Sequence, residues 1–75
     1  MGLLQIREVR DMTTNLQKMR KKRGYSQSQL ADKSNVKLPM IQKYEQGVKN
    51  INKASVETVL KLANALHCDI TDIME

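Results

Sequence analysis

The side chains best suited to do chemistry in this sequence, by type and number, are basic. Residues 13–53 hold ten lysines and arginines against only Asp32 and Glu45. Residues 54–75 reverse this balance, with Lys61 against four acidic side chains. Because ammonium and guanidinium groups bind phosphate, a cationic block followed by an acidic one indicates one face suited to a polyanion. The net charge of +5 is equally compatible with a nucleic-acid ligand and with an ordinary solvated surface.

Enzymatic and metal chemistry find little support in the same residues. The three glycines are isolated, so there is no glycine-rich loop to hold a nucleotide phosphate. The only histidine and the only cysteine are neighbours, His67 and Cys68, and no further residue of either kind completes a zinc-binding set. We therefore expect no catalytic site, no cofactor and no metal, and we interpret Cys68 as a small buried thiol at a helix end.

Length and composition predict one small domain. The 75 residues have room for one core, and a hydrophobic content of 40% suffices to form it. One cysteine permits no intrachain disulfide, and charges at Arg7 and Glu8 interrupt any secretory signal. No apolar run approaches the ~18 residues of a membrane span. We expect a cytoplasmic protein without a membrane segment, with an N-terminal arm over 1–12 and a domain over 13–75.

The elements that must position the basic side chains are short helices. Hydrophobic spacing and capping residues predict an all-α fold of four or five of them. Ser26 and Gln29 form a capping-box pattern. Asn35 tolerates the left-handed conformation that ends a helix, and Gly47 supplies another stop. The predicted helices cover about 14–23, 27–34, 38–46, 55–66 and 71–74, with a polar loop over 48–54.

The predicted core is aliphatic, because the chain has two tyrosines and neither phenylalanine nor tryptophan. Its members recur at the three- and four-residue spacing of helices that bury one face. They are Leu16, Met19, Leu30, Ala31, Val36, Ile41, Tyr44, Val56, Val59, Leu60, Ala63, Leu66, Ile70 and Ile73.

Residues 26–46 have the spacing of a helix-turn-helix. Asn35 lets the chain fold back between two short helices, and the small Ala31 lets those helices approach closely. Ile41 and Tyr44 are placed to fix the angle between them. The opposite face of the second helix is largely polar and remains free to enter a DNA major groove.

A resemblance to a known family is carried by residues 26–47, SQSQLADKSNVKLPMIQKYEQG. This segment is similar to the helix-turn-helix of lambda repressor and Cro-like (xenobiotic-response-element) regulators. The likeness extends over about residues 15–74 and implies a lambda-repressor-like DNA-binding domain. The residues that carry it are Ser26, Gln27, Leu30, Ala31, Val36, Ile41, Glu45 and Gly47.

The resemblance implies a role for each matching position. Gln27, which opens its helix, is expected to bind a DNA phosphate together with the helix N-terminus. Lys49 and Asn50 are expected to grip the DNA backbone from the loop that follows. The positions expected to face base edges or flanking phosphates are Lys37, Leu38, Pro39, Gln42 and Lys43.

The expected reading edge departs from the family pattern. The segment Leu38–Met40 is apolar where polar residues are usual, so its first two residues have only a thymine methyl to contact. Hydrogen-bonded readout then falls to Gln42, toward adenine, and to Lys43, toward guanine. Lys37 stands where the family usually has a Ser or Thr cap, and lysine cannot cap a helix.

Arg20 and Glu45 match a pair that often forms a salt bridge in this family. The residues support the contact independently, because Arg20 shares the inward stripe of its helix with Leu16, and Glu45 adjoins the inward Tyr44. A charge at a partly buried position needs a partner. We therefore predict that Arg20 and Glu45 form a structural salt bridge, with their charged groups within about 5 Å of each other.

The resemblance implies a transcriptional regulator, most simply a repressor, that binds double-stranded DNA sequence-specifically with helix 38–46 in the major groove. One helix reads few base pairs, so a homodimer on two half-sites is expected. Apolar C-terminal positions, including Val59, Ile70 and Ile73, are the predicted dimer surface, with the arm 1–12 as the rival. Two other functions stay open. One is an antitoxin-type subunit that also binds a toxin protein, and the other is a protein-interaction module that has lost DNA binding.

Overall fold

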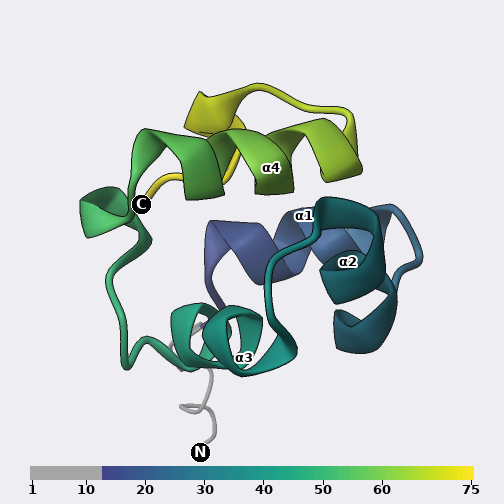
Figure 1. Ribbon diagram of the computed structural model, residues 1–75, viewed down its shortest axis with the longest axis horizontal. Helices are drawn as coiled ribbons and strands as arrows, with labels where there is room; N and C mark the ends of the chain where they lie inside the picture. Colours follow the sequence, from purple (N-terminus) through teal and green to yellow (C-terminus); the bar gives the residue numbers. More distant parts are fainter. Residues whose placement is uncertain (1–12) are drawn as a thin grey trace, which may run out of the picture.

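The computed structural model describes residues 13–75, which form four α-helices and two 3-10 turns (Figure 1). In chain order these are α1 (Asn15–Lys22), α2 (Gln27–Ser34), α3 (Leu38–Gln46), the turn η2 (Ile51–Lys53), α4 (Val56–Leu66) and the turn η3 (Ile70–Asp72). The predicted all-α fold is confirmed. The arm predicted over 1–12 lies outside the described residues. Within the described part of the chain, each helix is too short or too polar to cross a lipid bilayer.

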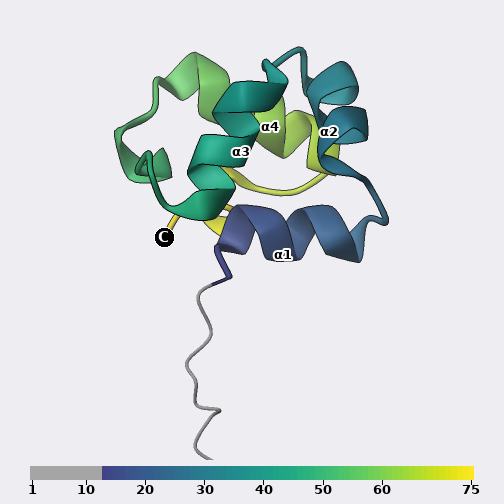
Figure 2. The same ribbon diagram turned by 90° about the horizontal axis from the view of Figure 1, so that it is seen from below.

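The four helices surround one core. In Figure 1, α4 lies at the top and α3 at the bottom, with α1 and α2 between them. Seen from below in Figure 2, α3 lies in front of α4. Helix α2 contacts both α3 and α4, α1 packs against α3 and η3, and η3 folds back on α4. The α2–α3 pair is therefore supported by α1, which packs against α3, and by α4, which packs against α2.

Local capping sets the helix boundaries close to those predicted. The Ser26 hydroxyl accepts a hydrogen bond from the Gln29 N–H at 3.0 Å, and the Ser26 N–H donates to the Gln29 side chain at 2.8 Å. Asn35 ends α2 in the left-handed conformation, with a φ of 60°. Gly47 ends α3 in the same way, with a φ of 79°. Helices that carry their own stop signals end where the sequence predicts.

Apart from Tyr44 the core is aliphatic, as predicted, and every helix contributes to it. Met19, Ala31 and Ile70, which were expected inside it, are only partly buried around it. The buried hydrophobic side chains are Leu16, Leu30, Val36, Ile41, Tyr44, Ile51, Val59, Leu62, Ala63, Leu66 and Ile73.

Two predicted core positions in α4 are wrong. Val56 is 70% exposed and Leu60 is 42% exposed, whereas Leu62 is fully buried. At 3.6 residues per turn, a stripe through Val59, Leu62 and Leu66 leaves Leu60 at its margin. Val56 begins the helix and projects away from the elements packed against it. Because α4 has leucine at both 60 and 62, hydrophobic spacing alone allowed either choice of inward face.

The short segments beyond α3 and α4 also differ from the prediction. The polar loop predicted over 48–54 contains η2, and Ile51 of this turn is 3% exposed, so the segment is anchored in the core. The last helix, predicted over 71–74, is instead the 3-10 turn η3. Its start is closed by the Asp69 N–H, which donates to the Asp72 carboxylate at 2.9 Å.

Leu62→Ala should destabilise the domain far more than Leu60→Ala. Leu62 is fully buried, and its truncation leaves a cavity that costs about 2–5 kcal/mol. Leu60 is the same residue type in the same helix but is 42% exposed, so its truncation should cost less than about 1 kcal/mol. Urea unfolding of the two variants at one dilute protein concentration measures the difference. Equal losses would contradict the placement of the inward stripe of α4.

Candidate nucleic-acid interface

Helix α3 has one anchored face and one open face. Ile41, Tyr44 and Glu45 are buried and hold the helix to the rest of the domain. Met40 is half-buried and packs against the core. The side chains on or beside the open face are the exposed Pro39, Lys43 and Gln46 and the half-buried Leu38 and Gln42. The helix is therefore held rigidly from one side while it presents a row of mixed side chains on the other.

The first turn of α3 has no capping side chain, as the sequence indicates. Lys37 occupies the cap position in an extended conformation and makes no side-chain capping hydrogen bond. Its carbonyl accepts from the N–H groups of Met40 and Ile41, at 3.0 and 3.2 Å. A cation at the positive end of a helix dipole is unfavourable, and a bound phosphate would relieve this repulsion. The start of α3 is thus better suited to an anion than to solvent alone.

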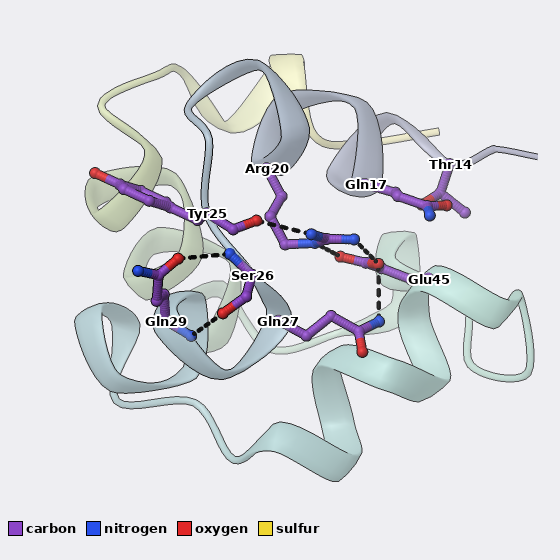
Figure 3. A network of polar contacts seen from close by, with 8 residues as sticks. All are labelled: Thr14, Gln17, Arg20, Tyr25, Ser26, Gln27, Gln29 and Glu45. Carbon is purple, nitrogen blue, oxygen red and sulfur yellow. Dashed lines mark hydrogen bonds and ion pairs between the residues drawn. The ribbon is translucent and has the colours of Figure 1, made fainter.

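A buried ion pair fastens α3 to α1 (Figure 3). Arg20 donates from Nε to Glu45 Oε2 at 2.7 Å and from Nη2 to Oε1 at 2.9 Å. The expected contact between these two side chains is therefore formed, and it is bidentate. The side chains are only 10% and 3% exposed. Water screens such a pair little, so removing either partner leaves the other charge buried without compensation.

The same network reaches the start of α2. Arg20 Nη1 donates to the Tyr25 carbonyl at 2.8 Å, and the Tyr25 N–H donates to the Arg20 carbonyl at 3.1 Å. Gln27 Nε2 donates to Glu45 Oε1 at 3.0 Å (Figure 3). Three helices therefore meet at one carboxylate: α1 through Arg20, α2 through Gln27 and α3 through Glu45.

The contact with Glu45 bears on the phosphate-binding role expected of Gln27. Phosphate oxygens only accept hydrogen bonds, so the side chain of Gln27 can bind one only through its amide nitrogen. One of the two hydrogens on that nitrogen is committed to Glu45. The second remains able to donate. Gln27 is therefore a strut between α2 and α3 as well as a candidate phosphate ligand, a double role that its position in the sequence did not reveal.

The loop after α3 carries Lys49 and Asn50 directly beside that helix. The N–H groups of Val48 and Lys49 both donate to the Lys43 carbonyl, at 3.0 and 3.2 Å. Asn50 Oδ1 accepts a hydrogen bond from the Asn52 N–H at 2.9 Å. This contact orients the Asn50 amide, so that its Nδ2 is the end left to donate to an external acceptor. An open hollow of about 480 Å³ joins the loop to α3 and is lined by Met40, Tyr44, Lys49, Asn50, Lys53, Ala54, Ser55 and Thr58.

Two other basic side chains have structural roles that sequence reasoning missed. Arg23 donates to the carbonyls of Leu66 and His67, at 2.7 and 3.1 Å, and so satisfies the C-terminal end of α4. The Lys33 ammonium lies 5.0 Å from the centre of the Tyr25 ring. The partners of Arg23 lie more than forty residues further along the chain. No local pattern distinguishes this arginine from the lysines that precede it.

Four exposed lysines surround α3 and have no neutralising partner among residues 13–75. Lys37 precedes the helix, Lys43 lies on its open face, and Lys49 and Lys53 follow it. The ion pairs within the described residues involve none of these four side chains. Positive charge that is concentrated around one helix and left unpaired creates a favourable potential for a polyanion.

His67 and Cys68 lie apart from α3, at the end of α4. His67 ends that helix in the left-handed conformation, with a φ of 54°. Burial raises the pKa of the Cys68 thiol, and the neighbouring Asp72 carboxylate raises it further. A raised pKa keeps the thiol protonated, which weakens it as a nucleophile and as a metal ligand. Among residues 13–75, no three His, Cys, Asp or Glu side chains are grouped so as to hold a metal ion.

Glu45→Gln should lower the free energy of unfolding by about 3–5 kcal/mol, because it leaves the Arg20 guanidinium buried without a countercharge. The double variant Arg20→Gln/Glu45→Gln should recover part of this loss, since neither charge then remains inside. Lys61→Ala is the control, because it removes the exposed ion pair with Glu57 at 3.6 Å and should cost about 1 kcal/mol or less. Urea unfolding measures all three. A Glu45→Gln variant as stable as Lys61→Ala would show that the buried pair is not a structural constraint.

Comparison with known proteins agrees with this geometry. The helix-turn-helix family model matches residues 16–73, from the first turn of α1 to the residue after η3. No curated protein matches the sequence. The match covers most of the chain and includes the α2–α3 pair with the buried network that fastens it to α1. The chain therefore belongs to the lambda repressor/Cro-like family of helix-turn-helix DNA-binding domains.

Proposed function

We propose that this protein is a transcriptional regulator that binds double-stranded DNA sequence-specifically, with α3 in the major groove. The observation that carries the proposal is the open face of α3, which is surrounded by four lysines that form no ion pair within the described part of the chain, while the opposite face is held in the core. A helix with its side chains is about 10–12 Å across, and the major groove is about 12 Å wide. The helix therefore fits the groove, and its unpaired charge faces the phosphates.

Base readout in this proposal falls mainly to two residues of α3. Lys43 is exposed and can donate to the O6 and N7 acceptors of guanine. Gln42 is half-buried beside it and matches the donor and acceptor of adenine. Leu38 and Pro39 add apolar contact with a thymine methyl. Sequence preference should therefore be concentrated at a few base pairs.

Phosphate contacts fix the register of α3 in the groove. The second amide hydrogen of Gln27, which comes from the start of α2, and the Nδ2 of Asn50, in the loop after α3, are donors for these contacts. Lys37 and Lys49 add charge at the two ends of α3. Because these contacts carry no base information, they support binding to every sequence equally.

Repression is the simplest regulatory outcome, because a protein that occupies DNA excludes other proteins from the same site. An antitoxin-type subunit would share this interface and differ by its added protein partner. The apolar segment Leu38–Met40 invited a different alternative, a protein-interaction module. Met40 packs against the core, which leaves less apolar surface for such a partner.

We further propose that two copies bind together through the exposed side of α4. The sequence suggested Val59, Ile70 and Ile73 for this surface. Val59 and Ile73 are 4% and 0% exposed and are unavailable to a second copy, and Ile70 is partly buried. Val56 and Leu60 lie one turn apart on the same helix and are 70% and 42% exposed. Their apolar area makes the outer side of α4 a better dimer surface than the positions chosen from the sequence.

The charges beside this apolar pair are suited to two-fold symmetry. Glu57 and Lys61 lie one turn apart, with 3.6 Å between the carboxylate and the ammonium. When two α4 helices pack antiparallel about a two-fold axis, Glu57 of one copy lies opposite Lys61 of the other, and the reverse holds as well. To bind one operator, such a dimer must present its two α3 helices to half-sites about 34–36 Å apart, or a multiple of that spacing.

Lys43→Ala and Lys49→Ala should weaken DNA binding in different ways. Loss of Lys43 should cost about 1–3 kcal/mol on the preferred site and relax the preference at one base pair. Loss of Lys49 should weaken binding to all sequences alike and lower the slope of log affinity against log salt by about one. Titration of both variants against the preferred duplex and its single-base variants separates the two effects. The preferred duplex is obtained by selection from a random pool.

Wild-type protein that binds no duplex from that pool, even at low salt, would contradict DNA binding itself. Equal losses for Lys43→Ala on every duplex would instead deny Lys43 a reading role and leave the phosphate contacts intact.

Leu60→Asp should convert the dimer to monomers in sedimentation velocity, because it places two carboxylates beside the symmetry axis. It should weaken binding to a duplex with two half-sites far more than binding to a single half-site. Glu57→Lys should act similarly by opposing like charges, and the double variant Glu57→Lys/Lys61→Glu should restore the dimer. A dimer that survives Leu60→Asp unchanged would exclude α4 as the interface.

A further inference from the structure

Two residues at the end of the described chain are hydrogen-bonded to segments far away in the sequence. The Asn15 N–H donates to Glu75 Oε2 at 2.7 Å, and Asn15 Nδ2 donates to the Met74 carbonyl at 2.7 Å. Asn52 Nδ2 donates to the Glu75 carbonyl at 3.1 Å, and Asn52 Oδ1 accepts from the Glu75 N–H at 2.9 Å. We call Asn15, Asn52, Met74 and Glu75 the clasp. It ties the first turn of α1 to η2.

The clasp lies next to the loop that carries two proposed phosphate ligands. In both ribbon views the C-terminus lies beside the turn η2 (Figures 1 and 2). A hollow of about 310 Å³ has Glu75 in its lining together with Lys49, Asn50 and Ile51. The clasp and the loop therefore form the walls of the same small space.

Contacts at both ends restrain this loop. At the α3 end, the Lys49 N–H donates to the Lys43 carbonyl at 3.2 Å. At the other end, Ile51 is buried and the Asn52 N–H donates to the Asn50 side chain at 2.9 Å. Asn52 therefore uses its backbone N–H to orient Asn50, and it uses its side chain to hold η2 to Glu75. Its two side-chain bonds add a second link, besides the buried Ile51, between this end of the loop and the rest of the domain.

We propose that Asn52 is a positioning residue for the contact of Lys49 and Asn50 with the DNA backbone. The inference rests on the proposed DNA binding and adds to it a residue that lies outside the helix-turn-helix motif of residues 26–46. Asn52 acts through the loop and need not touch DNA. A loop that is ordered before DNA arrives does not have to be ordered during binding, so its phosphate contacts contribute more to affinity.

The test of this positioning role measures the salt dependence of DNA binding, and it exploits the fact that the side chain of Asn52 is uncharged. Log affinity falls with log salt in proportion to the number of phosphates that the protein neutralises, by about 0.9 for each in duplex DNA. Asn52 carries no charge, so its own removal releases no counterion. Asn52→Ala should nevertheless weaken duplex binding several-fold and lower the salt slope by about one, because Lys49 is no longer held at its phosphate.

Three further variants decide between positioning and a merely structural role. When Lys49 has already been replaced by alanine, Asn52→Ala should leave the salt slope unchanged and should weaken binding less than it does in the wild type, because only the uncharged contact of Asn50 is then left to lose. Thr71→Ala, an exposed neutral substitution in η3, should bind like the wild type. Circular dichroism checks that each variant is folded at the assay temperature. Asn52→Ser, whose side chain is too short to span to Glu75, replaces Asn52→Ala if the latter does not fold.

Fluorescence anisotropy of a labelled duplex over a salt series measures these slopes. A wild-type slope for Asn52→Ala, or an equal further loss in the Lys49→Ala background, would overturn the positioning role while leaving DNA binding intact. Absence of binding by the wild-type protein would overturn both proposals together. The inference would be supported if Asn52→Ala lowers the salt slope of the wild-type protein but does not lower it further in the Lys49→Ala variant.

Discussion

The bidentate contact between Arg20 and Glu45 is the constraint on which the rest of the structure depends. Both charges are nearly excluded from water, so neither side chain can move without leaving the other uncompensated. This fixes α3 relative to α1, and Gln27 joins the same carboxylate from the start of α2. The angle between the two helices of the motif is therefore held by a polar network on one side and by aliphatic packing on the other.

This frame explains why α3 can carry side chains that contribute nothing to the fold. Its inner face already supplies Ile41 and Tyr44 to the core, and Glu45 to the ion pair. Lys43 is left without a partner among the described residues, and a phosphate or a guanine edge can supply one. The loop after α3 likewise has one side chain in the core and another free to contact DNA, because Ile51 is buried while Lys49 is exposed.

Sequence reasoning succeeded where the determinant was local or where a buried charge required a partner. The capping box, the left-handed Asn35 and the Arg20–Glu45 pair belong to these classes. It failed where distant segments decide the outcome. Leu60 and Leu62 are equally hydrophobic, and only the packing of α2 against α4 selects the second. The bonds of Asn52 to the end of the chain likewise span more than twenty residues. The roles of individual residues in DNA recognition stay predictions.

The central claim is that the buried network presents the open face of α3 and the following loop to DNA. Backbone NMR shifts, recorded while the isotope-labelled protein is titrated with a selected duplex, test it most directly. The account predicts the largest changes at Gln42, Lys43 and Lys49, with small changes along the outer side of α4, around Leu60. Changes centred on α4, with α3 unaffected at saturating duplex, would contradict it.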